Sequence, residues 1–514
     1  MIHKKILLPV LIGSAFFLGA CGEDDSAPIS PIPTPAPESS AAVAPPPASS
    51  AAVVPPASSA VVPPPASSAV APVPESSAAV PPPASSAVEP PPASSASAPN
   101  PVNYAPLATS ANQATASSIY ALWKGYHFVA KETEATYYAS IAGDYNIVFP
   151  ATYDGAAGGV GRVVWSAQSS YYKDYCSVSD ATVSSMKFRA CTVSEGIGYG
   201  MLLAYFNNDV DAFNRLWNYT RGFRAYHNAK LMPWITMSFH WTEVDNSSAT
   251  DADLDIATSL ILMHYKMTAA GDAAAANTYL TDALTFVNAI WEKEVNPSTL
   301  LIYSGDDDSW KKATSAYNLS YFSPVAIRLF AMVDPAHNWQ GVLDANYAYM
   351  KKVQDAGTGV FPDWSDANGK AIDPNNGSAK STYWTFNKES VRIPWRIAWD
   401  YYWYQDPRAA AILTKLNEFI SKKASGDPNS TALSTNYSWD LSVGKDYANS
   451  SVSNQWYSAW CATGIAGNST WLNKCTTGLN GKKLSNGPTS YFSDILTTMY
   501  SGLLNGLFVR PAGL

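Results

Sequence analysis

Three carboxylates of this 514-residue chain lie where helices are predicted to begin, and a pair of carboxyl groups can supply an acid and a base for catalysis. They are Glu195, which follows Thr192-Val-Ser, Asp251, which follows Ser248-Ala-Thr, and Glu389, which follows Asn387-Lys. Each could instead cap its helix or complement the helix dipole, and Thr192-x-x-Glu195 has the pattern of a capping box. If these helices run parallel in a barrel, however, their first turns meet at one end, which predicts a shared site.

Three glycines follow Glu195 at every second position, in Glu195-Gly-Ile-Gly-Tyr-Gly-Met201. Glycine is about 1 kcal/mol less favourable than alanine inside a helix, so this spacing needs a reason. One reason is the close approach of another group to the backbone. We expect Glu195 to be a catalytic acid and the glycines to make room for a bulky substrate.

Large aromatic residues lie in the loops near the predicted helix starts. Aromatic faces beside carboxylates suit a polysaccharide, because sugar rings present C–H faces on which they stack, although some of these residues are expected to be plain core. They are Trp234, Trp241, Trp310, Trp364, Trp384 and Trp456.

Charge and motif spacing exclude several other functions. The net charge is −8 and no basic run occurs, which argues against a nucleic-acid partner. No CxxC or HExxH pattern is present, so zinc is not expected. Asp251-Ala-Asp253-Leu-Asp255 imitates a calcium loop, but Ile256 stands where a glycine is required. We predict neither a metal nor a cofactor.

The first 103 residues differ from the rest. Residues 1–20 have two lysines, a short apolar run and small residues, as in an export signal. Leu18-Gly-Ala-Cys21 resembles a lipobox, which predicts a lipid on Cys21, with an ordinary secretory signal as the alternative. Residues 21–103 are rich in Pro, Ala, Ser and Val and are expected to form an extended linker. We therefore expect an exported protein anchored by lipid at the cell envelope or surface.

Residues 104–514 are expected to form one domain of amphipathic helices with few strands, an all-α fold. Cys176 with Cys191 and Cys461 with Cys475 are close in sequence, and an exported chain is oxidised, so we predict two local disulfides. The predicted helices cover residues 112–128, 192–207, 210–221, 251–270, 273–294, 320–333, 341–354, 388–404, 408–424, 453–466, 470–478 and 491–508.

Four segments in this region resemble glycoside hydrolase family 8 and occur in the family's order. The run from Ala249 to Leu260, Ala-Thr-Asp-Ala-Asp and an apolar helix, is similar to the family signature, and the run from Ser194 to Met201 resembles its general-acid segment. Arg392-Ile-Pro-Trp-Arg resembles the segment that carries the base, and Ser320-Tyr321-Phe-Ser-Pro a fourth motif. The resemblance implies an (α/α)6 barrel, inversion at the anomeric carbon and a β-1,4-linked substrate such as cellulose, lichenan, xylan or chitosan.

The resemblance also implies roles for single residues. Glu195 would be the acid that protonates the leaving oxygen, and Asp251 would bind the sugar at the cleavage point and favour its distorted ring. Arg392 and Tyr321 would position the base and its water, and Trp241 would be a stacking platform. We expect burial and the charge of Asp251 to keep Glu195 protonated near neutral pH, against the effect of the helix dipole.

The base is where the sequence departs from the family. Many members have an aspartate three residues before the arginine, and here that residue is Glu389. Inverting enzymes keep their two carboxyls about 6.5–9.5 Å apart, and one extra methylene moves a carboxylate by roughly 1.5 Å. In some branches of the family the base lies in the preceding loop, where Asp363 and Asp366 are the alternatives. We predict Glu389.

These features together predict an inverting, endo-acting hydrolase of β-1,4 bonds in plant cell-wall polysaccharide. The Pro-Trp-Arg segment favours cellulose or mixed-linkage β-glucan. A xylanase or chitosanase of the same family is the alternative, and the small number of acidic residues argues against chitosan. A non-catalytic surface lipoprotein that binds polysaccharide is the alternative from another class. We expect a monomer.

Overall fold

The computed structural model describes residues 103–133, 159–165, 191–227, 229–237, 242–312, 316–375, 377, 382–440, 452–484 and 490–514. Within these ranges the chain forms twelve α-helices and seven short β-strands. No helix in the described ranges combines the length and the apolar character needed to cross a bilayer.

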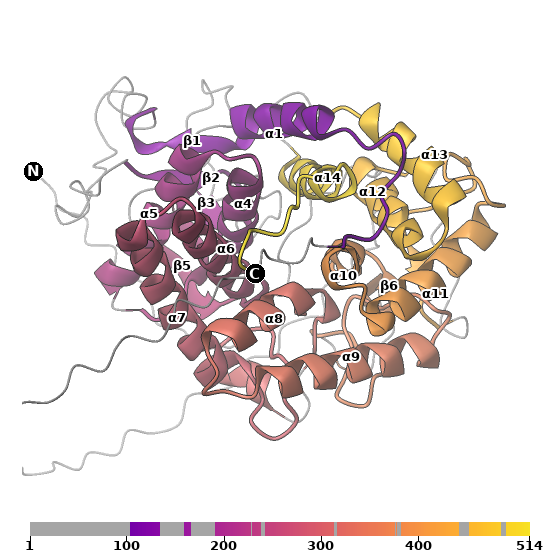
Figure 1. Ribbon diagram of the computed structural model, residues 1–514. Helices are drawn as coiled ribbons and strands as arrows, with labels where there is room; N and C mark the ends of the chain where they lie inside the picture. Colours follow the sequence, from indigo (N-terminus) through magenta and orange to yellow (C-terminus); the bar gives the residue numbers. More distant parts are fainter. Residues whose placement is uncertain are drawn as a thin grey trace, which may run out of the picture. The chain divides into compact units, whose positions relative to one another are not determined.

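Six helices form a closed inner ring, in which each helix contacts the next and the last contacts the first (Figure 1). All of α4 except Phe206 is buried, and so is α6 from its first residue to Met263. A helix that is buried on all sides belongs in the interior. In ring order the inner helices are α4 (Ser194–Phe206), α6 (Thr250–Ala269), α8 (Pro324–Val333), α10 (Ile393–Tyr404), α12 (Asn454–Ala462) and α14 (Tyr491–Leu504).

Each inner helix packs chiefly against one outer helix (Figure 1). The outer helices bury only one face, as in α11, where Ile412, Leu416 and Ile420 recur at a spacing of four. The (α/α)6 barrel is therefore confirmed. The outer helices, in the order of their inner partners, are α5 (Val210–His227), α7 (Ala273–Glu294), α9 (Trp339–Ala356), α11 (Pro407–Lys423), α13 (Ser469–Asn480) and α1 (Gln113–His127).

Short strands hold the first turns of two inner helices, α4 and α6, next to each other. β3 (Cys191–Val193) leads into α4, and β5 (Thr242–Ser248) leads into α6. Both strands pair antiparallel with β4 (Pro233–Met237), so the starts of α4 and α6 are fixed side by side. The remaining strands form two further antiparallel pairs, β1 (Phe128–Ala130) with β2 (Gly161–Val163) and β6 (Thr385–Phe386) with β7 (Tyr437–Ser438).

All twelve predicted helices occur, and α7 has the predicted bounds. The helix predicted over residues 388–404 differs, because it is divided into a 3₁₀ turn at Ser390–Arg392 and α10. Pro394, near the start of α10, has no backbone N–H to continue the hydrogen-bond ladder. The prediction that Glu389 lies in the first turn of the helix is therefore wrong, since it precedes the 3₁₀ turn.

The glycines of α4 lie against other parts of the protein. A Cβ on Gly196 would be 3.0 Å from the hydroxyl of Tyr491, and one on Gly198 would be 2.9 Å from Cβ of Asp255 on α6. The expected close approach to the backbone is confirmed, but the prediction that the glycines make room for a substrate is wrong. The capping box is wrong as well, because Thr192 is in β3 and its hydroxyl donates to the carbonyl of Val163.

The Cys461–Cys475 disulfide is confirmed, with Cα atoms 5.2 Å apart. It joins inner helix α12 to outer helix α13. Cys191 is also disulfide-bonded, and its predicted partner Cys176 lies outside the described residues.

Candidate active site

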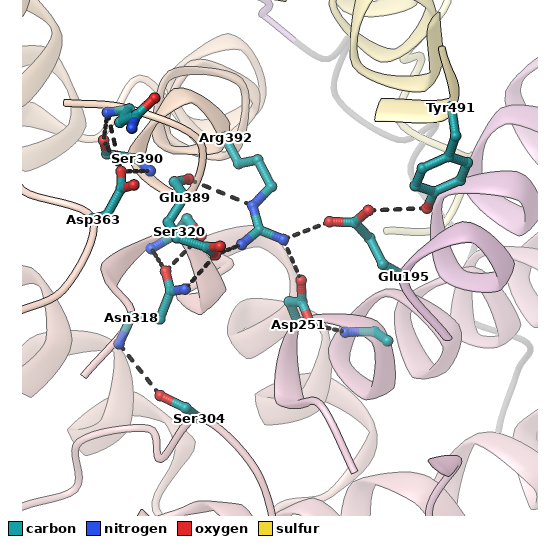
Figure 2. A network of polar contacts seen from close by, with 12 residues as sticks. Glu195, Asp251, Ser304, Asn318, Ser320, Asp363, Glu389, Ser390, Arg392 and Tyr491 are labelled. Carbon is teal, nitrogen blue, oxygen red and sulfur yellow. Dashed lines mark hydrogen bonds and ion pairs between the residues drawn. The ribbon is translucent and has the colours of Figure 1, made fainter. Parts of the chain in front are cut away.

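The side chain of Arg392 binds three carboxylates that come from three segments of the chain (Figure 2). Its Nη1 donates to Oε2 of Glu195 at 2.5 Å and to Oδ2 of Asp251 at 2.8 Å. Its Nη2 donates to Oε2 of Glu389. We call these four side chains the Arg392 cluster, and each of them is buried. The structure thus brings together the predicted acid, the predicted base, Asp251 and the arginine.

Glu195 and Asp251 hold equivalent positions, because each is the second residue of its inner helix. The strands that precede the two helices are joined through β4, which brings the two first turns together. The placement of Asp251 in the first turn of its helix is confirmed, and its Oδ1 also accepts from the backbone N–H of Ala252 at 2.9 Å. The positive ends of both helix dipoles face the cluster and favour negative charge there.

Glu389 reaches the cluster from the turn that precedes α10. Besides Arg392 it binds Asn318, whose side-chain amide donates to Oε2 at 2.6 Å. Burial raises the pKa of Glu389 to about 7, while the guanidinium of Arg392 and the amide of Asn318 act in the opposite direction. A carboxyl group in this range takes up and releases a proton near neutral pH, as a catalytic base has to do.

The two alternative bases have other positions. Asp363 is buried, and its Oδ1 accepts from the backbone N–H groups of Asn387 and Ser390 and from the Ser390 hydroxyl. It therefore fixes the turn that carries Glu389. The carboxylate of Asp366 accepts from the backbone of Asn368 and Lys370 and closes a loop. Both aspartates hold loop geometry, whereas Glu389 contacts Arg392.

The predicted substrate-binding residues have different outcomes. The ring of Tyr321 lies against the guanidinium of Arg392, with a distance of 5.2 Å from Cζ to the ring centroid. Tyr321 also packs edge-to-face on Trp364, which is stacked on the half-buried Trp310. Trp241 lies outside the described residues.

Of the other tryptophans predicted to lie in loops near the helix starts, Trp234 and Trp384 are partly exposed, while Trp364 and Trp456 are buried. Trp234, which belongs to β4, packs edge-to-face on Trp165. Only the partly exposed members can present a face to a sugar, so the expectation that some of these residues belong to the core is confirmed.

Sequence reasoning missed two residues of the site. Tyr491, at the start of α14, donates its hydroxyl to Oε1 of Glu195 at 2.9 Å (Figure 2). Asn318, which binds Glu389, lies two residues before the Ser320-Tyr321 motif and could have been found as its extension. For Tyr491 the only signal was Gly196, whose missing side chain leaves space for the tyrosine hydroxyl.

Two buried carboxyl groups on either side of a guanidinium can serve as an acid and a base. Among the residues that the structure describes, no group of three or more His, Cys, Asp or Glu side chains is arranged to hold a metal ion. Hydrolysis of a glycosidic bond uses two carboxyl groups in these two roles. Fold and site thus define a helical-barrel protein of the glycosidase class.

The chain belongs to glycosyl hydrolases family 8, whose family model matches residues 156–504. Endoglucanase C of Ruminiclostridium cellulolyticum is 35% identical over 231 residues, which are 45% of this chain and 47% of that protein. The Beta-glucanase of Niallia circulans is 32% identical over 258 residues, 46% of this chain and 60% of that protein. The chain spans about half the length of the curated relatives it matches.

Solved structures have the same fold. The apo structure of a β-1,3-1,4-glucanase from Paenibacillus sp. X4 matches with a TM-score of 0.59 at 22% identity, over 79% of this chain and 95% of that one. Rex8A from Paenibacillus barcinonensis, complexed with xylose, matches with a TM-score of 0.53 at 18% identity, over 63% and 84%.

Proposed function

We propose that this protein is an inverting, endo-acting hydrolase of β-1,4 bonds in plant β-glucan, either cellulose or a mixed-linkage glucan. The observation that carries the proposal is the guanidinium of Arg392, which lies between Glu195 and Glu389 and keeps the two carboxyl groups apart (Figure 2). An inverting hydrolase needs such a separation, because a water molecule has to fit between the base and the sugar. The relatives named as glucanases support the choice of substrate.

In the proposed reaction, protonated Glu195 gives its proton to the glycosidic oxygen as the bond to the anomeric carbon breaks. Ionised Glu389 takes a proton from the water that attacks the opposite face of that carbon. Asp251 binds the sugar at the cleavage point, and Tyr321 and Arg392 hold the base and the water. Because burial raises the pKa of Glu389 to about 7, the base is ionised above that pH.

Arg392 has to change partners during this reaction. A cation 2.5 Å from Oε2 of Glu195 favours the ionised carboxylate, whereas an acid has to be protonated. We propose that a bound sugar withdraws Nη1 of Arg392 from Glu195 and leaves the arginine with Asp251 and Glu389. A structure with a bound oligosaccharide in which Nη1 still contacts Glu195 would contradict this step.

The deciding experiment measures reducing-sugar release and viscosity with carboxymethylcellulose, mixed-linkage β-glucan, xylan and chitosan. We expect a rapid fall in viscosity of the two glucans and an initial product of α configuration in proton NMR. Faster release from xylan would favour the xylanase alternative, which the structural match to Rex8A supports. Binding to polysaccharide without release from any of the four would instead favour a non-catalytic surface protein.

We further propose that the protein is exported and acts as a lipid-anchored monomer at the cell envelope. The lipobox-like Leu18-Gly-Ala-Cys21 and the Pro/Ala/Ser-rich residues that follow support this location. Metabolic labelling with a palmitate analogue should mark the full chain, and Cys21→Ala should abolish the label. A labelled Cys21→Ala protein would refute the anchor.

A further inference from the structure

The two carboxyl oxygens of Glu195 have different neighbours (Figure 2). Oε2 faces Nη1 of Arg392, and Oε1 accepts a hydrogen bond from the hydroxyl of Tyr491 at 2.9 Å. Tyr491 is the first residue of α14 and is almost completely buried, with 1% of its surface exposed. A neutral carboxyl group carries its proton on one oxygen only. Once a bound sugar has withdrawn Nη1 of Arg392 from Oε2, as proposed above, Tyr491 still donates to Oε1, which leaves the proton to Oε2.

Tyr491 is held between two neighbours, His127 on one side and Gly196 on the other. One turn along α14, Asp494 binds Nε2 of His127 on α1 at 3.0 Å, and both side chains are buried. The ring of His127 also packs edge-to-face on the ring of Tyr491, with centroids 6.4 Å apart. On the other side, a Cβ on Gly196 would lie 3.0 Å from the Tyr491 hydroxyl, so only glycine leaves the hydroxyl in its place without displacement.

Building on the proposed function, we propose that Tyr491 is a positioning residue for Glu195, whose hydroxyl occupies Oε1 and thereby places the transferable proton on Oε2. Oε2 is the oxygen on the side of Arg392 and Glu389, where the sugar has to lie between acid and base. A proton on Oε1 instead would face the phenol and could not reach a glycosidic oxygen at that place.

The hydrogen bond also strengthens during the reaction. The O–H bond at Oε2 breaks as the glycosidic oxygen gains the proton and its bond to the anomeric carbon is cleaved. Glu195 is left as a carboxylate, whose negative charge spreads onto Oε1. A hydrogen bond from Tyr491 to a charged oxygen is stronger than one to a neutral oxygen, so the phenol stabilises the transition state more than the ground state.

This role makes the effect of Tyr491 depend on the leaving group. A sugar alcohol is a poor leaving group and needs the proton of Glu195, whereas a dinitrophenolate leaves without protonation. Tyr491→Phe should therefore lower kcat on cellohexaose roughly 10- to 100-fold, the value of one hydrogen bond to a charged group. On a dinitrophenyl β-cellotrioside the loss should be less than about 3-fold, because the acid step is bypassed.

The pH dependence gives a second readout. A donor at Oε1 favours the ionised form of Glu195, so its removal should move the alkaline limb of kcat/KM to higher pH. Gly196→Ala, which displaces the hydroxyl while Tyr491 remains, should show the same difference between the two substrates. Tyr457→Phe is the matched control, because it removes a buried hydroxyl that binds Asn429 and the carbonyl of Cys475, away from the Arg392 cluster.

Equal losses on both substrates in Tyr491→Phe, with an unmoved alkaline limb, would overturn the proposed role and leave Tyr491 as a packing residue. Melting temperatures of all three variants identify any loss that comes from unfolding, and Gly196→Ala tests the role if Tyr491→Phe does not fold. Absence of hydrolysis of both substrates by the wild-type protein would instead overturn the proposed function itself.

Discussion

Two buried arginines, Arg392 and Arg396, lie one helical turn apart and have different numbers of acidic partners. Among the described residues Arg396 binds one carboxylate, that of Asp255, through parallel bonds of 2.8 and 2.9 Å. Arg392 shares its guanidinium among three carboxylates. The acids are repeated in the same way, because Asp251 and Asp255 are one turn apart on α6. The segment that carries the two arginines thus contacts α6 twice, once through Arg392 and Asp251 and once through Arg396 and Asp255, but the two arginines bind different numbers of carboxylates.

The number of acids for each arginine distinguishes a structural ion pair from a cluster that can take part in catalysis. The Arg396–Asp255 pair is balanced and uses the fork geometry in which arginine binds carboxylate best. The Arg392 cluster has three acids for one cation in a buried place, where unpaired charge is costly. Burial raises the pKa of Glu389 to about 7 and the charge of Glu195 adds to the effect, whereas burial raises the pKa of Asp255 in the balanced pair to about 6. Excess acid with shifted proton affinity is what acid–base chemistry requires.

The largest expected effect is that of Glu195→Gln. The variant keeps the shape and the hydrogen bond from Tyr491 but has no proton to give. We expect kcat on β-glucan to fall roughly 10³-fold or more, with oligosaccharide binding retained. Reducing-sugar assays and calorimetry measure the two quantities. A near-wild-type kcat would show that Glu195 is not the acid and that the Arg392 cluster, like the Arg396–Asp255 pair, has a structural role.

Glu389→Gln should lower the activity about 10²- to 10⁴-fold, because glutamine cannot take a proton from the attacking water. Azide should restore turnover on an aryl glycoside as a glycosyl azide of inverted configuration, because a small anion needs no base. Asp363→Asn is the matched control, since it weakens the cap of the same turn but leaves Glu389 in place. Azide rescue in Asp363→Asn or Asp366→Asn, and not in Glu389→Gln, would show that the base has been misassigned.

The Arg396–Asp255 pair should affect stability more than chemistry. Arg396→Met leaves Asp255 buried without its cation, and we expect a loss of about 3–5 kcal/mol in the free energy of unfolding. The double variant with Asp255→Leu removes both charges and should recover most of that loss. Chemical denaturation measures both variants. If the double variant were as unstable as the single one, the balanced pair would not explain the difference between the two arginines.

Much of the fold could be predicted because its signals are local. The helix over Ala273–Glu294 was predictable from one apolar face, and in the structure the side chain of Asp272 caps it by accepting from the backbone N–H of Ala275. The break before α10 was also present in the sequence, since Pro394 cannot donate to the ladder. The closing of the inner ring depends on contacts between distant helices, such as α14 with α4, for which periodicity carries no signal.

The site was predictable only as far as its members lie in motifs. Glu195, Asp251, Arg392 and Glu389 each follow a recognisable pattern, and the structure places them together. Tyr491 is 296 residues from Glu195 and begins an ordinary apolar helix, so no local pattern links the two. The partners of Arg392 were also incompletely predicted, because which carboxylates one guanidinium reaches depends on side-chain geometry in three dimensions.

The smallest expected effect concerns a third group of buried acids, for which no arginine partner occurs within the part of the chain that the structure describes. Asp253 and Glu294 are fully buried, and Oδ2 of Asp253 and Oε2 of Glu294 each lack a donor among the described residues, so a proton shared between the two carboxyl groups would satisfy both. Burial raises the pKa of both, that of Glu294 to about 8. Comparison with the two arginines shows three arrangements for buried acid, namely one cation for one acid, one cation for three acids, and a shared proton, in addition to the backbone N–H groups that cap Asp363.

The shared proton gives stability a pH dependence whose sign follows from linkage. Between its ordinary range and about pH 8 Glu294 is protonated in the folded chain but ionised in the unfolded chain, so stability falls as pH rises through this window. Glu294→Gln stays neutral, and its melting temperature should rise relative to wild type by roughly 2–4 °C between pH 6 and 8. The control Glu292→Gln removes an exposed carboxylate that pairs with Lys230 and should show no such trend. Parallel melting curves for wild type and Glu294→Gln across this window would mean that Asp253 and Glu294 do not share a proton in the folded chain.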